Sequence, residues 1–354
     1  MQDKKISYHE QTSRDNTRKL RQVLDTLPGF CRDYFRAMEP KTSAKTRISY
    51  VYDIRLFFNF LCENNPVFKN TDDIRSIRID DLEKLTALDI EEYMEYLKLY
   101  EDEAGVTHTN NERGLKRKLA SLRSFFNYYF KHEMISVNPT VIVDMPKLHK
   151  REIVRLDYDE VADLLDYVEH GGETMTGMKR TYFEKNKTRN LALITLLLGT
   201  GIRVSECVGL DVEDIDFKNN RIRIIRKGGK EDFVYFGEEV RTALSGYYEE
   251  RRVIPAKNGH EHAFFLSIQK RRITVQAVED LVKEAAGHVT TVKHITPHKL
   301  RSTYGTSLYR ETGDIYLVAE VLGHNDVNTT RRHYAALDED RKRRAASAVT
   351  LRKD

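Results

Sequence analysis

"TRNLALITLLLGTGIRVSE" spans residues 188–206 and joins a long apolar run to an abrupt glycine break. The run from Leu191 is far shorter than the ~20 apolar residues that cross a bilayer, so it predicts a buried helix that ends at glycine. Arg203 follows the break, and a second helix is predicted from about Ser205. An arginine beside a helix N-terminus adds its N–H donors to the positive end of the helix dipole, which favours an anion site. Alone, the pattern is equally typical of a surface arginine.

A hairpin is predicted downstream, in "RIRIIRKGGKEDFVYFG" (residues 221–237). Apolar and charged residues alternate around Gly228 and Gly229, the pattern of two strands joined by a tight turn. Lys227 ends the first strand, and neighbouring arginines would lower its pKa toward the range of a general acid. A charged hairpin tip is the commoner meaning of such a sequence. Upstream, residues 156–170 predict a helix and "GGETMTGMKR" (171–180) predicts a loop.

A third polar cluster lies in "TPHKLRSTYGTSLYRETG", residues 296–313. Thr296 is the expected N-cap, and Gly313 is the expected end of the helix. His298 and Arg301 then stand at i and i+3 in the first turn, where backbone N–H groups are unsatisfied. An anion could meet an imidazole, a guanidinium and the helix dipole together, although a capped surface helix has the same appearance.

"LGHNDVNTTRRHY", residues 322–334, follows a helix that Asp314 is expected to start and Gly323 to end. His324 lies in the turn, and a new helix carrying Tyr334 is predicted after it. Of the basic residues that directly precede this tyrosine, only Arg331, at i−3, shares its helix face. Any strong activation of the phenol is therefore expected from tertiary neighbours.

The N-terminal half is predicted to be a small all-helical domain, residues 1–145. Apolar residues recur at helical spacing over residues 43–64, 91–99 and 111–130, with Ser43 as an N-cap. Prolines and basic residues without periodicity then predict a linker over residues 146–155, followed by a catalytic domain over residues 156–354. The predicted fold class is mainly α with a small antiparallel β-sheet.

Composition excludes few functions. Lys and Arg number 59 against 55 Asp and Glu, so the net charge is only +4, but residues 113–123 are almost purely basic. Three widely spaced cysteines, Cys31, Cys62 and Cys207, suit a reducing cytoplasm without disulfides. The polar N-terminus predicts no signal peptide and no membrane insertion. No zinc-ligand spacing is present, so neither a metal nor another cofactor is expected.

Two arginines, two histidines, a lysine and a tyrosine suit phosphodiester chemistry without a metal. Arginines can neutralise the nonbridging oxygens of a phosphate at the transition state. A tyrosine can attack the phosphorus, and a lysine can protonate the departing sugar oxygen. A phosphotyrosine link would conserve the energy of the broken bond, so no ATP would be needed.

The ordered motifs "TGIRVSE", "RKGGK", "HKLR" and "LGH", followed by a tyrosine, resemble the tyrosine recombinases of the integrase family. Residues 42–61 and 117–139 are similar to the N-terminal core-binding (SAM-like) domain of that family. Within it the chain resembles the Xer recombinases, closest to the XerS branch. The resemblance implies a two-domain, C-shaped DNA clamp.

The resemblance also implies roles for individual residues. Arg203 and Arg301 would clamp the scissile phosphate. Tyr334 would be the nucleophile that forms a 3′-phosphotyrosine, and Lys227 would be the general acid toward the 5′-hydroxyl.

His298 would assist proton transfer, and His324 would hydrogen-bond the phosphate. Ser302 stands where the family most often has another histidine, and the interval from His324 to Tyr334 is one residue longer than in similar Xer proteins. Integrases of mobile elements also show the longer interval.

DNA contacts are expected from five basic residues of the N-terminal domain, mostly to phosphates: Lys45, Arg47, Lys116, Arg117 and Arg123. The expected partners are double-stranded DNA with inverted-repeat arms, three further copies in a synaptic tetramer, and a septal DNA translocase of the FtsK type. The C-terminal segment, residues 338–354, would either pack on a neighbouring protomer or remain a solvated helix.

Three functions stay open on the sequence. The first is a recombinase of the bacterial nucleoid that resolves chromosome dimers at a dif-like site through a Holliday junction. The second is an integrase or excisionase of a mobile element, suggested by the interval after His324. The third, suggested by Ser302, is a DNA-binding protein that no longer cuts. Type IB topoisomerases share the chemistry but resemble the N-terminal half less well.

Overall fold

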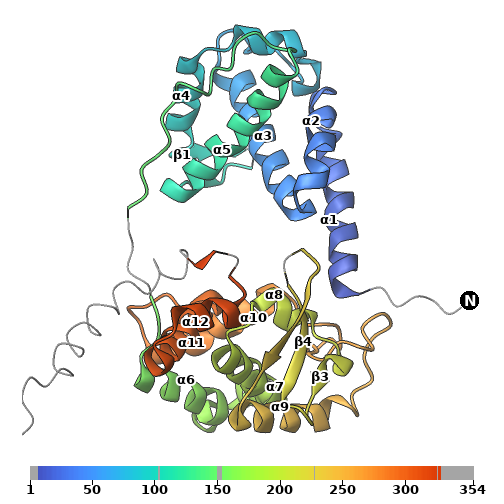
Figure 1. Ribbon diagram of the computed structural model, residues 1–354, viewed down its shortest axis with the longest axis vertical. Coiled ribbons are helices and arrows are strands. Elements are labelled where there is room, and N and C mark those ends of the chain that lie inside the picture. Colours follow the sequence, from blue (N-terminus) through green and yellow to red (C-terminus); the bar gives the residue numbers. More distant parts are fainter. Residues whose placement is uncertain (1–6, 103, 150–153, 227, 325, 328–354) are drawn as a thin grey trace, which may run out of the picture. The chain divides into compact units, whose positions relative to one another are not determined.

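The chain folds into two compact units, Met1–Arg151 and Glu152–Asp354, drawn in Figure 1. The computed structural model describes residues 7–102, 104–149, 154–226, 228–324 and 326–327. The division falls among the residues predicted as a linker. Helices dominate both units, and each unit holds one small antiparallel sheet, which confirms the predicted fold class.

The first unit is built on helices that the sequence begins with side-chain caps. In chain order they are α1 (Tyr8–Leu24), α2 (Cys31–Met38), α3 (Ala44–Asn64), α4 (Ala87–Tyr96) and α5 (Glu112–Lys131). The Ser43 hydroxyl accepts a bond from the Thr46 N–H and caps α3 as predicted. Helix α4 starts four residues earlier than predicted, because the Asp89 carboxylate accepts from the Thr86 N–H in a capping box.

Aromatic side chains form the core of this unit. Phe57 and Phe58 of α3 and Phe125 and Phe126 of α5 are completely buried. Between the two helices the rings meet edge to face; the Phe57 and Phe126 centroids lie 6.0 Å apart at an interplanar angle of 79°. Such pairs each add about 0.5–1.5 kcal/mol beyond area burial, so α3 and α5 are firmly joined.

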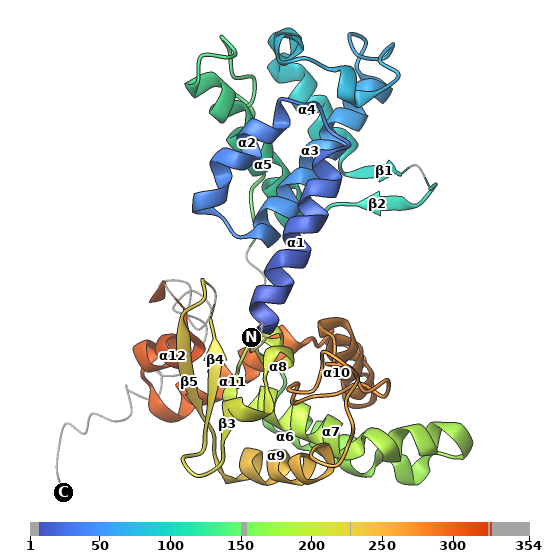
Figure 2. The ribbon, with the colours of Figure 1, turned by 90° about the vertical axis from the view of Figure 1, so that its right-hand side faces the viewer.

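The prediction that this unit is entirely helical is wrong at one place. Strands β1 (Leu99–Glu101) and β2 (Thr107–Thr109) pair antiparallel, and Figure 2 shows the hairpin extending from the helices. Tyr100 stacks on His108 across the pair, with ring centroids 5.1 Å apart. Cross-strand ring contacts of this kind stabilise a hairpin, but the run is too short to show a strand period.

The second unit combines mutually packed helices with a three-stranded sheet of order β3-β4-β5, which lies to one side of them in Figure 1. Its strands are β3 (Ile215–Asp216), β4 (Arg221–Ile225) and β5 (Glu231–Tyr235), and its helices are α6 (Tyr158–His170), α7 (Gly177–Thr200), α8 (Val204–Gly209), α9 (Glu238–Arg251), α10 (Val275–Val289), α11 (Pro297–Thr312) and α12 (Ile315–Leu322). Strands β4 and β5 form the predicted hairpin, with Ile225 opposite Glu231 and positive φ at Gly228 and Gly229.

Helix α7 corrects the predicted loop at residues 171–180. Only a 3₁₀ turn, Gly171–Thr174, precedes it, and the helix begins at Gly177 after the N-cap Thr176. Figure 2 shows the first half of α7 projecting from the rest of its unit. Phe183 packs edge-on against Tyr167 of α6, which anchors this polar half where apolar periodicity alone gave no helix signal. No described helix is long and apolar enough to span a membrane.

Candidate active site

Three arginines from distant segments converge on the C-terminal end of α12. Gly323 ends this helix in the left-handed region, at φ 60°. The last carbonyls of a helix have no partner within it and carry the negative end of its dipole. Here the carbonyls of Val321, Leu322 and Gly323 each accept a bond from a different arginine. The end of α12 therefore gathers positive charge just before His324.

Arg301 reaches this place from the first turn of α11. Its side chain is buried, with the residue only 4 % exposed. Its guanidinium donates to the Leu322 carbonyl and, at 2.5 Å, to the Gly201 carbonyl at the end of α7. Planar donors held on two carbonyls fix the direction of the group, so Arg301 is a preorganised cation.

Arg203 is the N-cap of α8 and approaches α12 from the other side. Its Nη2 donates to the Gly323 carbonyl at 3.0 Å, and its Nη1 donates to Glu206 Oε1 at 2.7 Å. Because the side chain is 34 % exposed, it can meet a ligand from solvent while it stays held. Arg203 and Arg301 thus bind the carbonyls of two consecutive residues, Gly323 and Leu322.

Glu206 and Arg226 are parts of this site that the sequence interpretation missed. The Glu206 side chain is only 4 % exposed and accepts from both arginines, with Arg226 Nη1 at 3.4 Å. The spacing from the cap at Arg203 to an acid three residues later is a capping-box signal that could have identified Glu206. Burial raises the pKa of the neighbouring Cys207 thiol, so this side chain stays neutral and adds no charge.

The two candidate histidines lie at helix ends: His298 near the start of α11, and His324 just after the end of α12. His298 stands in the first turn of α11 and is exposed, three residues before the buried Arg301. His324 follows α12 and is half-buried, and its N–H donates to the Ala319 carbonyl at 2.9 Å. Ser302 donates its hydroxyl to the His298 carbonyl at 3.1 Å, so this side chain serves its own helix. Lys227 and Tyr334, the expected general acid and nucleophile, lie outside the described residues.

The five basic residues expected at DNA fall into two groups. Lys45 and Lys116 are exposed. Arg117 is 44 % exposed and pairs with the buried Asp53, whose other oxygen accepts from Lys118 at 3.3 Å. Burial raises the pKa of the Asp53 carboxyl, and the two cations oppose that rise. These side chains lie on α3 and α5 of the first unit.

Arg47 and Arg123 are held by the protein itself. Arg47 is 6 % exposed and donates to the Glu39 carbonyl at 3.0 Å. Arg123 donates to the carbonyls of Thr140 and Val143 and so ties the segment after α5 to that helix. Both guanidinium groups have a structural role that the basic pattern did not reveal.

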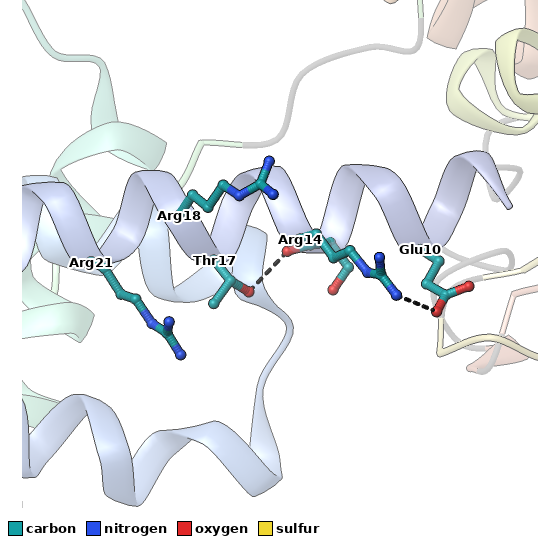
Figure 3. A pocket seen from close by; sticks show the side chains of 6 residues that line it. Glu10, Arg14, Thr17, Arg18 and Arg21 are labelled. Atoms are coloured by element: carbon teal, nitrogen blue, oxygen red, sulfur yellow. Dashed lines mark hydrogen bonds and ion pairs between the residues drawn. The ribbon is translucent and has the colours of Figure 1, made fainter. Parts of the chain in front are cut away.

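A further basic surface lies on α1, shown in Figure 3. It is an open hollow on one helix, lined by Glu10, Ser13, Arg14, Thr17, Arg18 and Arg21. Arg14 pairs with Glu10 at 3.3 Å, and both side chains are more than half exposed. The hollow is a solvated, partly neutralised surface, unlike the buried arginine cluster at α12. Within the described part of the chain, no group of three His, Cys, Asp or Glu side chains could hold a metal ion.

Comparisons with known proteins show the family to which this chain belongs. The family model of the phage integrase family matches residues 154–341, which include the whole arginine cluster. The tyrosine recombinase XerC of Caldanaerobacter subterraneus subsp. tengcongensis is 34 % identical over 326 residues, covering 90 % of this chain and 85 % of that protein. The tyrosine recombinase XerS of Streptococcus thermophilus is 29 % identical over 347 residues, covering 92 % of this chain and 96 % of that protein.

Solved structures share the fold at low identity. The Tn1549 transposon integrase in complex with transposon right end DNA has a TM-score of 0.61 at 20 % identity, covering 90 % of this chain and 99 % of that one. The XerH site-specific recombinase bound to difH substrate has a TM-score of 0.59 at 21 % identity, covering 84 % and 78 %. The chain belongs to the phage integrase family, as a tyrosine recombinase of the Xer type.

Proposed function

We propose that this enzyme cleaves and rejoins DNA at a specific site through a 3′-phosphotyrosine intermediate. The convergence of Arg203 and Arg301 on adjacent carbonyls at the end of α12 carries the proposal. Two guanidinium groups held on consecutive carbonyls repel each other, and a dianionic, pentacovalent phosphate would relieve that repulsion in the transition state. Tyr334 attacks the phosphorus, and Lys227 protonates the 5′-oxygen that leaves.

The histidines complete the proposed chemistry. His324 directly follows the carbonyls that hold the arginines, which suits a hydrogen bond to a nonbridging oxygen. His298 is exposed in the first turn of α11, which suits transfer of a proton to or from solvent. Ser302 is engaged with its own helix, so its presence does not disturb the arginine pair and gives little support to an inactive, DNA-binding protein.

DNA contact by the first unit is also proposed. Lys45, Lys116 and Arg117 are the exposed cations of the expected set and suit phosphate contacts. The buried or carbonyl-bound Arg47 and Arg123 serve the fold first. Double-stranded DNA with inverted-repeat arms, a synaptic tetramer and a Holliday junction intermediate follow from the same proposal.

The biological role that we propose is resolution of chromosome dimers at a dif-like site, with a septal DNA translocase as partner. The similarity to XerC and XerS along nearly the whole chain supports this role. Integration or excision of a mobile element is the second candidate, favoured by the interval between His324 and Tyr334.

Covalent trapping tests both the chemistry and the role. The protein is incubated with sheared host DNA and denatured, and the protein-bound fragments are sequenced, with Tyr334→Phe in parallel. We expect one palindromic locus near the replication terminus to be enriched and to disappear in the variant. Enrichment at a mobile-element end would select the second role, and DNA binding without tyrosine-dependent covalent DNA would contradict the catalytic proposal.

A further inference from the structure

Arg226 is a buried cation of the arginine cluster that has no role in the proposed chemistry. It lies at the end of β4, directly before Lys227 in the sequence, and is 8 % exposed. Its three nitrogen atoms donate to three different segments: Nε to Asp232 Oδ2 at 3.0 Å, Nη1 to Glu206 Oε2 at 3.4 Å and Nη2 to the Val321 carbonyl at 3.0 Å. The side chain therefore joins β5, α8 and the end of α12 to its own strand.

The Glu206 carboxylate closes these contacts into a ring. One oxygen accepts from Arg203 Nη1, and the other accepts from the Arg203 N–H at 2.8 Å and from Arg226. Arg203 and Arg226 both return to α12, at Gly323 and Val321 respectively. Arg203, the proposed phosphate-binding arginine, and Arg226, at the end of β4, therefore donate to the same two features: the buried Glu206 carboxylate and the C-terminus of α12.

Gly323 makes room for this ring. A Cβ at this position would lie 2.8 Å from Arg226 Cζ and 2.9 Å from its Nε. The guanidinium plane therefore packs directly against the backbone that carries the Arg203 acceptor. Displacement of Arg226 would therefore disturb both the end of β4 and the C-terminus of α12, because its side chain is bonded to β5, α8 and α12 at the point where they meet.

We infer that Arg226 is a positioning residue that holds the end of the β4–β5 hairpin against α12, so that the hairpin delivers Lys227 to the leaving oxygen. The inference rests on the proposed function. Arg226 is too buried, and too fully engaged with protein acceptors, to be a DNA ligand itself. It acts on the reaction only by fixing the strand that leads to the general acid.

A substrate with a sulfur leaving group tests whether Arg226 acts through the general acid, because a sulfur leaving group needs no proton. In a 5′-phosphorothiolate the tyrosine oxygen–phosphorus bond forms while the phosphorus–sulfur bond breaks, and the thiolate leaves without a proton. Single-turnover cleavage of the fragment recovered by trapping is measured with the oxygen and the sulfur substrate. We expect Arg226→Gln to be slowed about tenfold or more on the oxygen substrate and to approach the wild-type rate on the sulfur substrate.

Matched variants make the outcome decisive. Arg223 lies on the same strand, is 46 % exposed, and pairs with Asp214 and Glu231 instead of with the arginine cluster, so Arg223→Gln is expected to keep the wild-type rate on both substrates. Arg226→Lys keeps the charge but loses the planar fork, so it should fall between Gln and wild type. An Arg226→Gln protein that folds but is slowed equally on both substrates, or on neither, would overturn the inference.

Two further measurements separate this inference from the function on which it rests. Lys227→Met should be slowed about 100-fold or more on the oxygen substrate and should regain the wild-type rate on the sulfur substrate. Failure to regain that rate would refute the general-acid proposal and with it the inference.

Without DNA, Arg226→Gln should exchange amide hydrogens faster than Arg223→Gln at residues 321–324 and 231–235. Unchanged exchange would show that Arg226 does not couple these segments. If Arg226→Gln does not fold, Asp232→Asn, which removes the negative charge of a partly exposed partner of Arg226, is expected to give the same substrate-selective defect at smaller size.

Discussion

At the scale of single residues, two independent features require glycine at position 323: its backbone conformation and the side chain that packs against it. Its φ of 60° is costly for any residue with a Cβ, by about 1–2 kcal/mol. The same Cβ would also press on the Arg226 guanidinium. The glycine of the "LGH" motif is therefore required twice, by its own dihedral angle and by its neighbour.

Replacing Gly323 by alanine should lower the free energy of unfolding by about 1–2 kcal/mol or more, since strain and the displaced guanidinium add. Urea unfolding followed by circular dichroism measures this, because the chain contains no tryptophan. Gly287→Ala is the control: this glycine lies in α10, has no positive φ and has no atom within 4 Å of an added Cβ. That change should be neutral or stabilising by up to about 1 kcal/mol, and equal losses in both variants would contradict the prediction.

At the scale of elements, the three-stranded sheet carries a charged turn at the end of β3. The Asp216 carboxylate accepts from the Asn219 amide at 2.7 Å and from Arg221 Nε at 2.9 Å. The Asn219 bond is the largest cause that lowers the pKa of Asp216, from 3.8 to about 2, and the Arg221 bond acts in the same direction. These contacts hold β3 in register with β4, where Asp216 faces Arg221.

A lowered pKa in the folded state means that Asp216 stabilises the protein above about pH 4 and that this contribution is lost as the pH falls toward about 2. Asp216→Asn should therefore be less stable than wild type near neutral pH and should lose less stability on acidification. Thermal unfolding monitored over this pH range tests the sign. Asn219→Ala removes the principal donor and should reduce the same pH dependence. The contribution is small because the Asp216 side chain is partly accessible to solvent, and parallel curves for wild type and Asp216→Asn would refute it.

At the scale of the whole molecule, basic residues are divided between solvent and structure. Lys45 and Lys116 are exposed on the first unit, whereas Arg123 donates to carbonyls of the buried residues Thr140 and Val143. An exposed lysine that contacts a phosphate raises DNA affinity by releasing counterions, whereas a guanidinium bound to buried carbonyls raises the stability of the fold. The two kinds of residue should therefore fail in different ways.

Lys45→Ala and Lys116→Ala should each weaken binding to all DNA sequences and reduce the slope of log affinity against log salt by about one, without changing stability. Arg123→Ala should instead destabilise the first unit by about 1–3 kcal/mol, because two buried carbonyls lose their donor. Binding isotherms at several salt concentrations and urea unfolding of the same proteins measure both effects. A reduced salt slope for Arg123→Ala at unchanged stability would reverse this assignment.

The sequence by itself determined the features that act over a few residues. Ser43 and Asp314 cap their helices with side-chain bonds, Thr296 takes the predicted N-cap position of α11 without one, and the glycines at 313 and 323 end helices in the left-handed region. The Gly228–Gly229 turn pairs its flanking strands. The motifs around Arg203 and Arg301 were visible for the same reason, since each is a short pattern at one helix terminus. Two weakly periodic segments were missed: the strands of the β1–β2 hairpin are too short to show a period, and the first half of α7 is held by a ring contact with α6.

Only the tertiary structure decided which polar groups share the site. Arg203 and the Gly323 carbonyl are 120 positions apart, and Arg301 and the Gly201 carbonyl are 100 apart, so no local pattern encodes these bonds. The same holds for the Glu206 bridge to Arg226 and for the burial of Arg47 and Arg123. A charged side chain in a sequence carries no sign of its burial, because burial depends on surfaces that distant segments bring against it.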